Sequence, residues 1–120
     1  MHIRPEPPQI TPEAVTEALE NEHDRKILAA AQEGPIAAQD LIDATDTPRS
    51  TAYRRIERLV ELRLLRVASG AIKSGHAIER YRATVEWAAL SVSRGEVSAS
   101  WRLLESAEER LSRLWTQMRG

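Results

Sequence analysis

The chain has 120 residues, of which 42% are hydrophobic and 29% are charged, and its net charge is −1 at pH 7. These values predict one folded domain with one hydrophobic core. The chain contains no cysteine, which excludes disulfides, thiolate metal sites and a cysteine nucleophile. No apolar run approaches the roughly 18 residues of a membrane span. The proline-rich start is unlike a secretory signal, so we expect a cytoplasmic protein.

The charge is distributed unevenly along the chain. Residues 1–48 carry three basic residues against ten acidic ones, a net charge of −7. Residues 49–82 carry nine basic residues against three acidic ones, a net charge of +6, and residues 83–120 are balanced. A local basic patch is what contact with a phosphate backbone requires. The central segment is therefore the candidate for nucleic-acid binding.

The N-terminal third is predicted to be a flexible arm followed by helical segments. Residues 1–10 contain three prolines and should form the arm. Thr11 and the proline after it are typical of a helix start. Asn21 could cap a second helix, so the pattern of residues 11–33 fits one helix or two. Gly34 is expected to end this segment in the left-handed conformation.

Residues 36–63 carry the pattern of two helices joined by a tight turn. Residues 36–45 should form a short helix. Thr47 is predicted to cap a longer helix over about 48–62, with Pro48 at its first position. The second helix has an apolar stripe of Ala52, Ile56, Leu59 and Val60. A short helix, a turn and a longer basic helix follow the helix-turn-helix order.

The first half of the second helix exposes basic and hydroxyl side chains, while its acids fall in the second half. Such a helix can insert its first turns into a DNA major groove, because arginine donates paired hydrogen bonds to guanine. The alternative is an ordinary amphipathic surface helix. The predicted DNA-binding residues of this helix are Arg49, Ser50, Thr51, Tyr53, Arg54 and Arg58.

A basic β-hairpin is expected to follow. Residues 63–69 read as a short strand, residues 69–77 as a flexible basic loop, and residues 77–84 as a second alternating strand. A hairpin directly after a recognition helix is a wing. Its residues Lys73, His76, Arg80 and Arg82 are predicted to lie beside the phosphate backbone or in the adjacent minor groove.

The C-terminal segment is predicted to be a second hairpin and a helix. Residues 85–103 alternate as two strands with a turn at residues 93–96. Ser106 would open a capping box for a helix over about 107–118. This helix either packs on its own domain or pairs with a second copy, and we expect a homodimer. The predicted dimerisation residues are Leu111, Leu114, Trp115 and Met118.

Residues 36–84 resemble the winged helix-turn-helix regulators of prokaryotes, and small ArsR-like proteins of archaea in particular. The segment Thr-Pro-Arg-Ser-Thr-Ala-Tyr-Arg-Arg-Ile carries the resemblance. IclR-type regulators have a similar stretch, and the C-terminal Ser-Ala-Glu-Glu-Arg-Leu-Ser-Arg-Leu-Trp is similar to the end of some archaeal members. The resemblance implies a homodimeric transcription factor with the helix near 49–62 in the major groove. Those families usually have glycine where this chain has Arg63, so a non-glycine residue must make a left-handed turn there.

The expected fold class is α+β, mainly α: a winged helix-turn-helix domain over residues 11–84, with residues 85–120 forming a hairpin and a C-terminal dimerisation helix. The expected function is that of a sequence-specific DNA-binding regulator, and the alternative is a winged-helix module that binds a protein partner. No enzyme activity, cofactor or metal is expected. A metal site at His23 is disfavoured because its acidic neighbours diverge on a helix. The sequence does not identify an effector.

Overall fold

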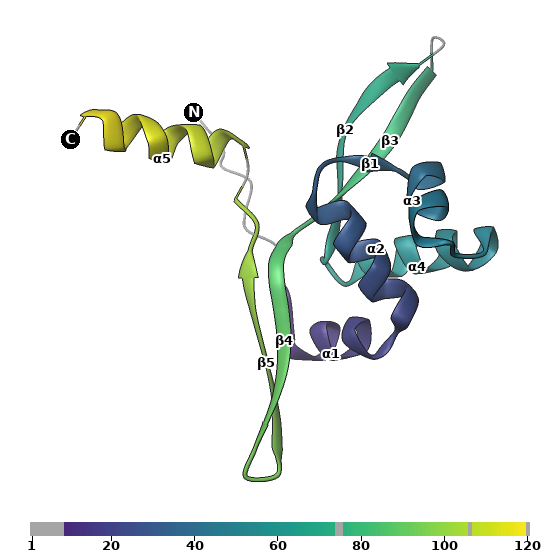
Figure 1. The fold of residues 1–120 in the computed structure, drawn as a ribbon, viewed down its shortest axis with the longest axis vertical. Coiled ribbons are helices and arrows are strands. Elements are labelled where there is room, and N and C mark those ends of the chain that lie inside the picture. The colour runs from purple at the N-terminus through teal and green to yellow at the C-terminus, as the bar shows by residue number, and fades with distance from the viewer. Residues whose placement is uncertain (1–8, 74–75, 106, 120) are drawn as a thin grey trace.

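The computed structural model describes residues 9–73, 76–105 and 107–119, and of residues 69–73, 76–77 and 107–108 it describes the backbone alone. The elements in chain order are α1 (Pro12–Glu20), α2 (Glu22–Gln32), β1 (Ile36–Ala37), α3 (Ala38–Thr45), α4 (Arg49–Glu61), β2 (Leu65–Lys73), β3 (His76–Ala83), β4 (Val85–Ser93), β5 (Glu96–Leu103) and α5 (Ala107–Arg119) (Figure 1). Three helices before α4 and a hairpin directly after it form a winged helix-turn-helix. The predicted α+β fold class is confirmed.

Residues 11–33 form two helices, because Asn21 interrupts them. Its backbone is extended, with φ −105° and ψ 121°, and its side chain accepts the N–H of Asp24 at 3.1 Å. Thr11 caps α1 as predicted and accepts the N–H of Ala14 at 3.1 Å. The prediction for Gly34 is wrong. α2 ends through Glu33 in the right-handed region, and Gly95 is the glycine with a positive φ among the described residues.

Two predictions around the turn before α4 are wrong. Residues Ile36 and Ala37, expected in a helix, instead pair with Tyr81 and Arg80 as a short strand. Asp46 makes the turn in the left-handed region, with φ 49°. Thr47 does not cap α4, because its buried hydroxyl lies 2.8 Å from that of Thr45 in α3. The residue before α4 is Pro48, which has no side-chain hydrogen bond to offer.

The C-terminal end of α4 has the predicted left-handed residue. Arg63 has a φ of 69°. The N–H of Leu64 donates to the carbonyl of Leu59 at 3.0 Å, and the N–H of Arg63 donates to that of Val60 at 3.0 Å. This pair of bonds is a Schellman motif, which usually has glycine at the position of Arg63. The motif turns the chain sharply from α4 into the wing.

The wing is part of a three-stranded antiparallel sheet in the order β1-β3-β2. β2 pairs with β3 from Leu65–Ala83 to Lys73–His76, with a register shift between Ala68 and Ala71. The first wing strand is therefore longer than predicted, since the expected loop over 69–77 is mostly strand. Residues 74 and 75 lie outside the described residues.

The core lies where α1, α2, α3 and α4 meet the base of the sheet. Ala52, Ile56 and Leu59 are buried in it and Val60 is partly buried, as their spacing predicts. Residues 1–8 of the predicted arm are not among the described residues. Ile10, the last residue of that arm, is 9% exposed and belongs to the core.

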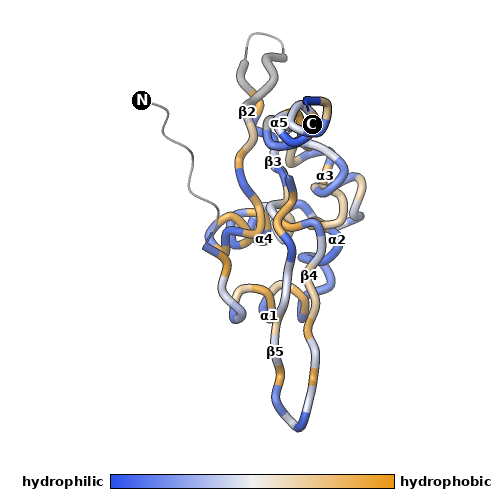
Figure 2. The backbone as a smooth tube through the Cα atoms, turned by 90° about the vertical axis from the view of Figure 1, so that its left-hand side faces the viewer, coloured by the Kyte–Doolittle hydropathy of each residue, from blue (hydrophilic) through white to orange (hydrophobic). Residues whose placement is uncertain are grey.

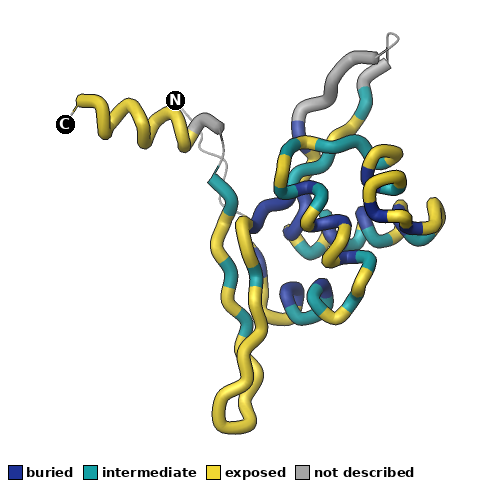
Figure 3. The backbone as a smooth tube through the Cα atoms, viewed as in Figure 1, coloured by how far each residue is buried: buried dark blue, intermediate teal, exposed yellow. Residues whose placement is uncertain are grey.

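The last three elements, β4, β5 and α5, form a C-terminal extension that projects from the core (Figures 1 and 3). The predicted hairpin is present, and Arg94 and Gly95 make its turn with φ values of 54° and 80°. Ala88, Ala99 and Trp101 at its base pack against the core, and the hairpin contacts α1. The hairpin tip extends past α1, and α5 stands apart with exposed side chains at residues 109–119. Ser106, the predicted cap of this helix, lies outside the described residues.

Candidate nucleic-acid interface

The first two turns of α4 present polar side chains to solvent. Arg49, Ser50, Tyr53 and Arg54 are exposed, and Thr51 is partly buried. The guanidinium of Arg49 lies 5.6 Å from the centre of the Tyr53 ring, a cation–π contact. Among the described residues, no carboxylate forms an ion pair with Arg49 or Arg54. Their donors are therefore available to a ligand.

The opposite side of α4 is tied to α2 by a buried ion pair that the sequence analysis did not predict. Asp24 is completely buried, and its carboxylate accepts two hydrogen bonds from Arg55, the one from Nε at 2.7 Å. The hydrogen bond to Asp24 is the main cause of the raised pKa of Arg55. The spacing in the sequence indicates that Arg55 is on the buried side of the helix, because it lies three residues after Ala52 and four before Leu59.

Arg58 ties α4 to α1 in the same way. Its Nε and Nη2 atoms each lie 2.7 Å from a carboxylate oxygen of Glu17, and its Nη1 lies 3.0 Å from Glu61. These bonds raise the pKa of Arg58, and the hydrogen bond from Arg58 is the main cause of the lowered pKa of Glu17. The predicted DNA contact of Arg58 therefore involves a guanidinium that already has two carboxylate partners.

His23 lies behind the turn that precedes α4. Its Nδ1 is 3.4 Å from the hydroxyl of Thr47, which is also bonded to Thr45. No group of three His, Cys, Asp or Glu residues within the described ranges could hold a metal ion. In this position His23 supports the turn between α3 and α4.

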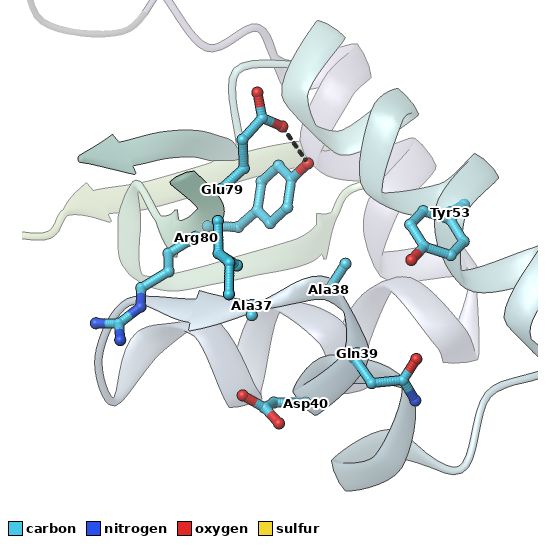
Figure 4. Close-up of a pocket in the computed structure, with 9 residues that line it drawn as sticks. Ala37, Ala38, Gln39, Asp40, Tyr53, Glu79 and Arg80 are labelled. Carbon is cyan, nitrogen blue, oxygen red and sulfur yellow. Dashed lines mark hydrogen bonds between the residues drawn. The ribbon is translucent and has the colours of Figure 1, made fainter. Parts of the chain in front are cut away.

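A hollow of about 540 Å³ lies between β3 and the start of α3, and Tyr53 of α4 also lines it. Figure 4 shows Tyr53 at one side of it and the guanidinium of Arg80 pointing away at the other. Two carboxylates, Asp40 and Glu79, also line it. Tyr81 donates to Glu79 at 3.1 Å, and burial followed by this hydrogen bond raises the pKa of Tyr81. These carboxylates make the part of the hollow that they line unsuitable for a phosphate.

Three arginines lie on the strands of the wing: Arg66, Arg80 and Arg82. Arg66 on β2 is directly opposite Arg82 on β3. Both lie on the side of the strands opposite Tyr81, because successive residues of a strand alternate. Arg82 is partly buried, and its pKa is lowered by burial and then by the charges of Arg66 and Arg110. In the described part of the chain none of the three has an ion-pair partner.

The other predicted wing residues are placed less completely. Arg80 is exposed on β3. Lys73 and His76 are the last paired residues before the wing tip, and their side chains are not among those that the structure describes. The wing therefore places Arg66, Arg80 and Arg82 along its strands and carries Lys73 and His76 toward its tip.

The predicted dimerisation residues form one uncovered stripe on α5. Leu111 is 69% exposed, Leu114 43%, Trp115 61% and Met118 81%. The guanidinium of Arg119 lies 5.7 Å from the centre of the Trp115 ring. No other described part of the chain covers this stripe. No helix among the described residues is long and apolar enough to cross a membrane.

Residues 26–69 match the IclR helix-turn-helix domain family. This segment runs from α2 through α3 and α4 into β2, so it contains every element of the helix-turn-helix. The match covers less than half of the chain, so the hairpin and α5 lie outside it. No curated protein matches this chain in sequence.

Two solved structures have a similar fold. The crystal structure of NolR from Sinorhizobium fredii has 14% sequence identity and a TM-score of 0.51, and the similarity covers 62% of this chain and 69% of that one. The solution structure of the homodimeric winged helix-turn-helix DNA-binding domain of Mb0332 from Mycobacterium bovis, described as a possible ArsR-family transcriptional regulator, has 22% identity and a TM-score of 0.48. That similarity covers 59% of this chain and 61% of the other, so it spans about three fifths of either molecule.

Proposed function

We propose that this protein is a sequence-specific DNA-binding transcription regulator that acts as a homodimer, with α4 in the major groove. The proposal rests on the winged helix-turn-helix fold and on the match of residues 26–69 to a helix-turn-helix family. The observation that carries it is the exposed start of α4. Within the described part of the chain Arg49 and Arg54 have no carboxylate partner, and Ser50 lies between them in the sequence.

The division of charge along α4 agrees with this orientation. The exposed residues of its first two turns are basic or hydroxylic, whereas Glu57 and Glu61 are exposed in its second half. A recognition helix contacts base edges with its N-terminal residues while its far end lies away from the duplex. Apolar residues at the exposed start would have favoured a protein partner instead.

The ion pairs behind α4 support the same function. Arg55 binds Asp24 of α2, and Arg58 binds Glu17 of α1. Both pairs are bidentate, which fixes direction as well as distance. The back of α4 is thereby anchored to two helices, and its front is presented to DNA in one orientation. We therefore assign Arg58 to the anchoring of α4, not to direct DNA contact.

We further propose that the wing contributes sequence-independent affinity. Arg80 would contact a phosphate beside the hollow that it lines, and Lys73 and His76 would do so toward the wing tip. Arg82 is partly buried at the base of the wing, so its contribution would be to the positive field more than to a direct contact. Phosphate contacts of this kind position a protein on the duplex without reading its sequence.

The homodimer is proposed from α5. A single recognition helix reads only a few base pairs, and helix-turn-helix proteins gain specificity by presenting two such helices about one DNA turn apart. An isolated helix of 13 residues is marginal in water. The uncovered stripe of Leu111, Leu114, Trp115 and Met118 gives α5 a surface that a second copy would stabilise.

Selection of binding sites from a random duplex library tests the function directly. The purified full-length chain is incubated with the library at about 100 mM salt, and bound DNA is sequenced over several rounds. We expect enrichment of one motif made of two related half-sites, because a two-fold dimer reads a two-fold site. A library without enrichment, from a protein that is folded by circular dichroism, would contradict the proposal and favour the protein-binding alternative.

A further inference from the structure

The β4–β5 hairpin has an apolar face that is covered only at the base of the hairpin. Six side chains share this face, since they alternate on paired positions of the two strands: Ala88, Leu90, Val92, Val97, Ala99 and Trp101. Ala88, Ala99 and Trp101 pack against the core beside α1. Toward the tip, Leu90 is 37% exposed, Val92 72% and Val97 62%. Figure 2 shows hydrophobic positions continuing along the hairpin beyond α1.

Toward the tip the opposite face of the hairpin is polar, although nearer the base that face carries Trp87, which is 43% exposed opposite Arg102. Ser91 and Ser98 lie on that face, and their hydroxyl oxygens are 2.8 Å apart. Ser100 is exposed next to them. A two-stranded hairpin is marginal alone and needs a further strand or a helix on its apolar face. α1 supplies that helix at the base, and within the described chain nothing supplies it at the tip.

We infer that α5 of a second copy covers the apolar tip of this hairpin, and that the exchange is reciprocal. This inference rests on the homodimer proposed above and names its interface. In this arrangement the stripe of α5 from one protomer lies on Leu90, Val92 and Val97 of its partner. The partner's α5 would continue the helical layer that α1 begins on the same face.

The dimensions of the two surfaces agree. The α5 stripe runs from Leu111 to Met118, seven residues apart, which is about 10 Å at 1.5 Å per residue. The apolar face of β4 runs from Ala88 to Val92, four residues apart, which is about 13 Å at 3.3 Å per residue. A helix of this length therefore covers the tip and reaches the part of the face beside α1.

The area favours an interface that includes both surfaces. The hairpin tip exposes three large apolar side chains and the α5 stripe exposes four. Each of these seven side chains offers on the order of 100 Å² of apolar surface. Pairing α5 with α5 alone would cover four of them per protomer, about 400 Å², which is typical of a lattice contact. Placing α5 on the partner's hairpin covers all seven, about 700 Å² per protomer. That value approaches the roughly 800 Å² per partner of a stable interface.

Cysteine cross-linking tests the arrangement, because the chain has no cysteine of its own. Full-length Val92→Cys and Leu114→Cys variants, one carrying a tag that changes its mass, are mixed and allowed to exchange subunits. They are then oxidised in a glutathione buffer that favours neighbouring thiols. We expect a mixed disulfide between the two variants. The matched control is Ser100→Cys mixed with Leu114→Cys, which places the thiol on the polar face and should give at least tenfold less product.

A second measurement does not depend on disulfide formation. Val92→Glu should weaken the dimer at least tenfold in sedimentation equilibrium, whereas Ser100→Glu should leave it unchanged. Self-linked Leu114→Cys without the mixed product, in a protein that sediments as a dimer, would overturn the inference but leave the proposed homodimer intact. A full-length chain that sediments as a monomer at tens of micromolar would overturn both. The DNA-binding proposal is tested separately by selection.

Discussion

At the scale of single residues, the four arginines of α4 have two different environments. Arg49 and Arg54 are exposed, while Arg55 and Arg58 each face a carboxylate on another helix. Arg58 uses both donor edges of its guanidinium on carboxylates, and Arg55 uses the Nε–Nη2 edge on Asp24, so both have less capacity left for a base or a phosphate. The arginines that lack a partner are therefore the ones that should control DNA binding.

Arg54→Ala should reduce affinity for the selected DNA motif by about 1–3 kcal/mol, if its guanidinium reads a guanine. Gel-shift titration against the selected motif measures the loss. The matched control is Arg102→Ala, which removes the same charge from an exposed position on β5. Equal affinities for Arg54→Ala and the parent protein, with the fold intact, would remove Arg54 from the interface.

Asp24→Ala should destabilise the fold by about 3 kcal/mol, because Arg55, only 18% exposed, loses its buried carboxylate and keeps only Glu17, whose nearest oxygen is 3.8 Å away. Urea unfolding followed by circular dichroism gives the free energy of unfolding. Glu22→Ala on the same helix removes an exposed pair with Lys26 and should leave that energy nearly unchanged, because solvent screens such a pair. Similar losses for the two variants would contradict a structural role for the buried pair.

The Glu17–Arg58 pair should make stability depend on pH. The pKa of Glu17 is lowered in the folded state by the hydrogen bond from Arg58. Its contribution is therefore fully present above the unfolded value of 4.5 and is lost as the pH falls through the lower folded value. The stability difference between the parent protein and Glu17→Gln should be positive at pH 7 and should shrink below pH 4.5. Urea unfolding at pH 7 and at a pH below 4.5 measures this stability difference. An equal difference at the two pH values would contradict the assignment.

At the scale of elements, the wing and the recognition helix should make different contributions to binding. α4 presents basic and hydroxyl side chains at its exposed start, which is the part of a recognition helix that contacts base edges. The described side chains of the wing strands include three arginines without ion-pair partners, which suit contact with phosphates. Phosphate contacts add affinity for every sequence and make that affinity depend on salt.

Lys73→Ala should weaken binding to all duplexes alike and lower the slope of log affinity against log salt by about one unit. Fluorescence anisotropy with the selected motif and with an unrelated duplex, at several salt concentrations, measures both effects. Arg80→Ala is expected to act in the same way. An unchanged slope would place the side chain away from the DNA.

At the scale of the whole molecule, the chain divides into a core whose apolar side chains are buried within one copy and a C-terminal extension whose apolar side chains are not. The core is buried between α1, α2, α3, α4 and the sheet. The hairpin tip and α5 leave seven large apolar side chains exposed. A protein that functions as a dimer can leave such surfaces uncovered in one chain, since the second copy removes them from water.

Removing residues 107–120 should convert a dimer into a monomer that retains the helix-turn-helix but binds the selected motif weakly. Sedimentation equilibrium of the full-length chain and of the truncated chain is the direct comparison. Circular dichroism shows whether α1 to α4 remain folded in the shorter chain. A full-length species of 13.5 kDa at tens of micromolar would contradict the dimer.

The sequence by itself determined the features that depend on local geometry. The stripe of Ala52, Ile56 and Leu59 follows from the 3.6-residue period. Arg63 takes the left-handed conformation because the Schellman motif at the end of α4 requires it. Arg94 and Gly95 likewise turn the second hairpin, since both positions need a positive φ.

Only the tertiary structure decided which side chains meet. Helical period places Arg55 and Arg58 on a side of α4, but the positions of α1 and α2 supply Glu17 and Asp24 as their partners. Thr47 turns toward Thr45 because the left-handed Asp46 redirects the chain before α4 begins. The amphipathic pattern of α5 predicted a covered helix, yet no described part of this chain reaches it. Periodicity specifies which face of an element is apolar, whereas the packing of distant segments decides what covers it.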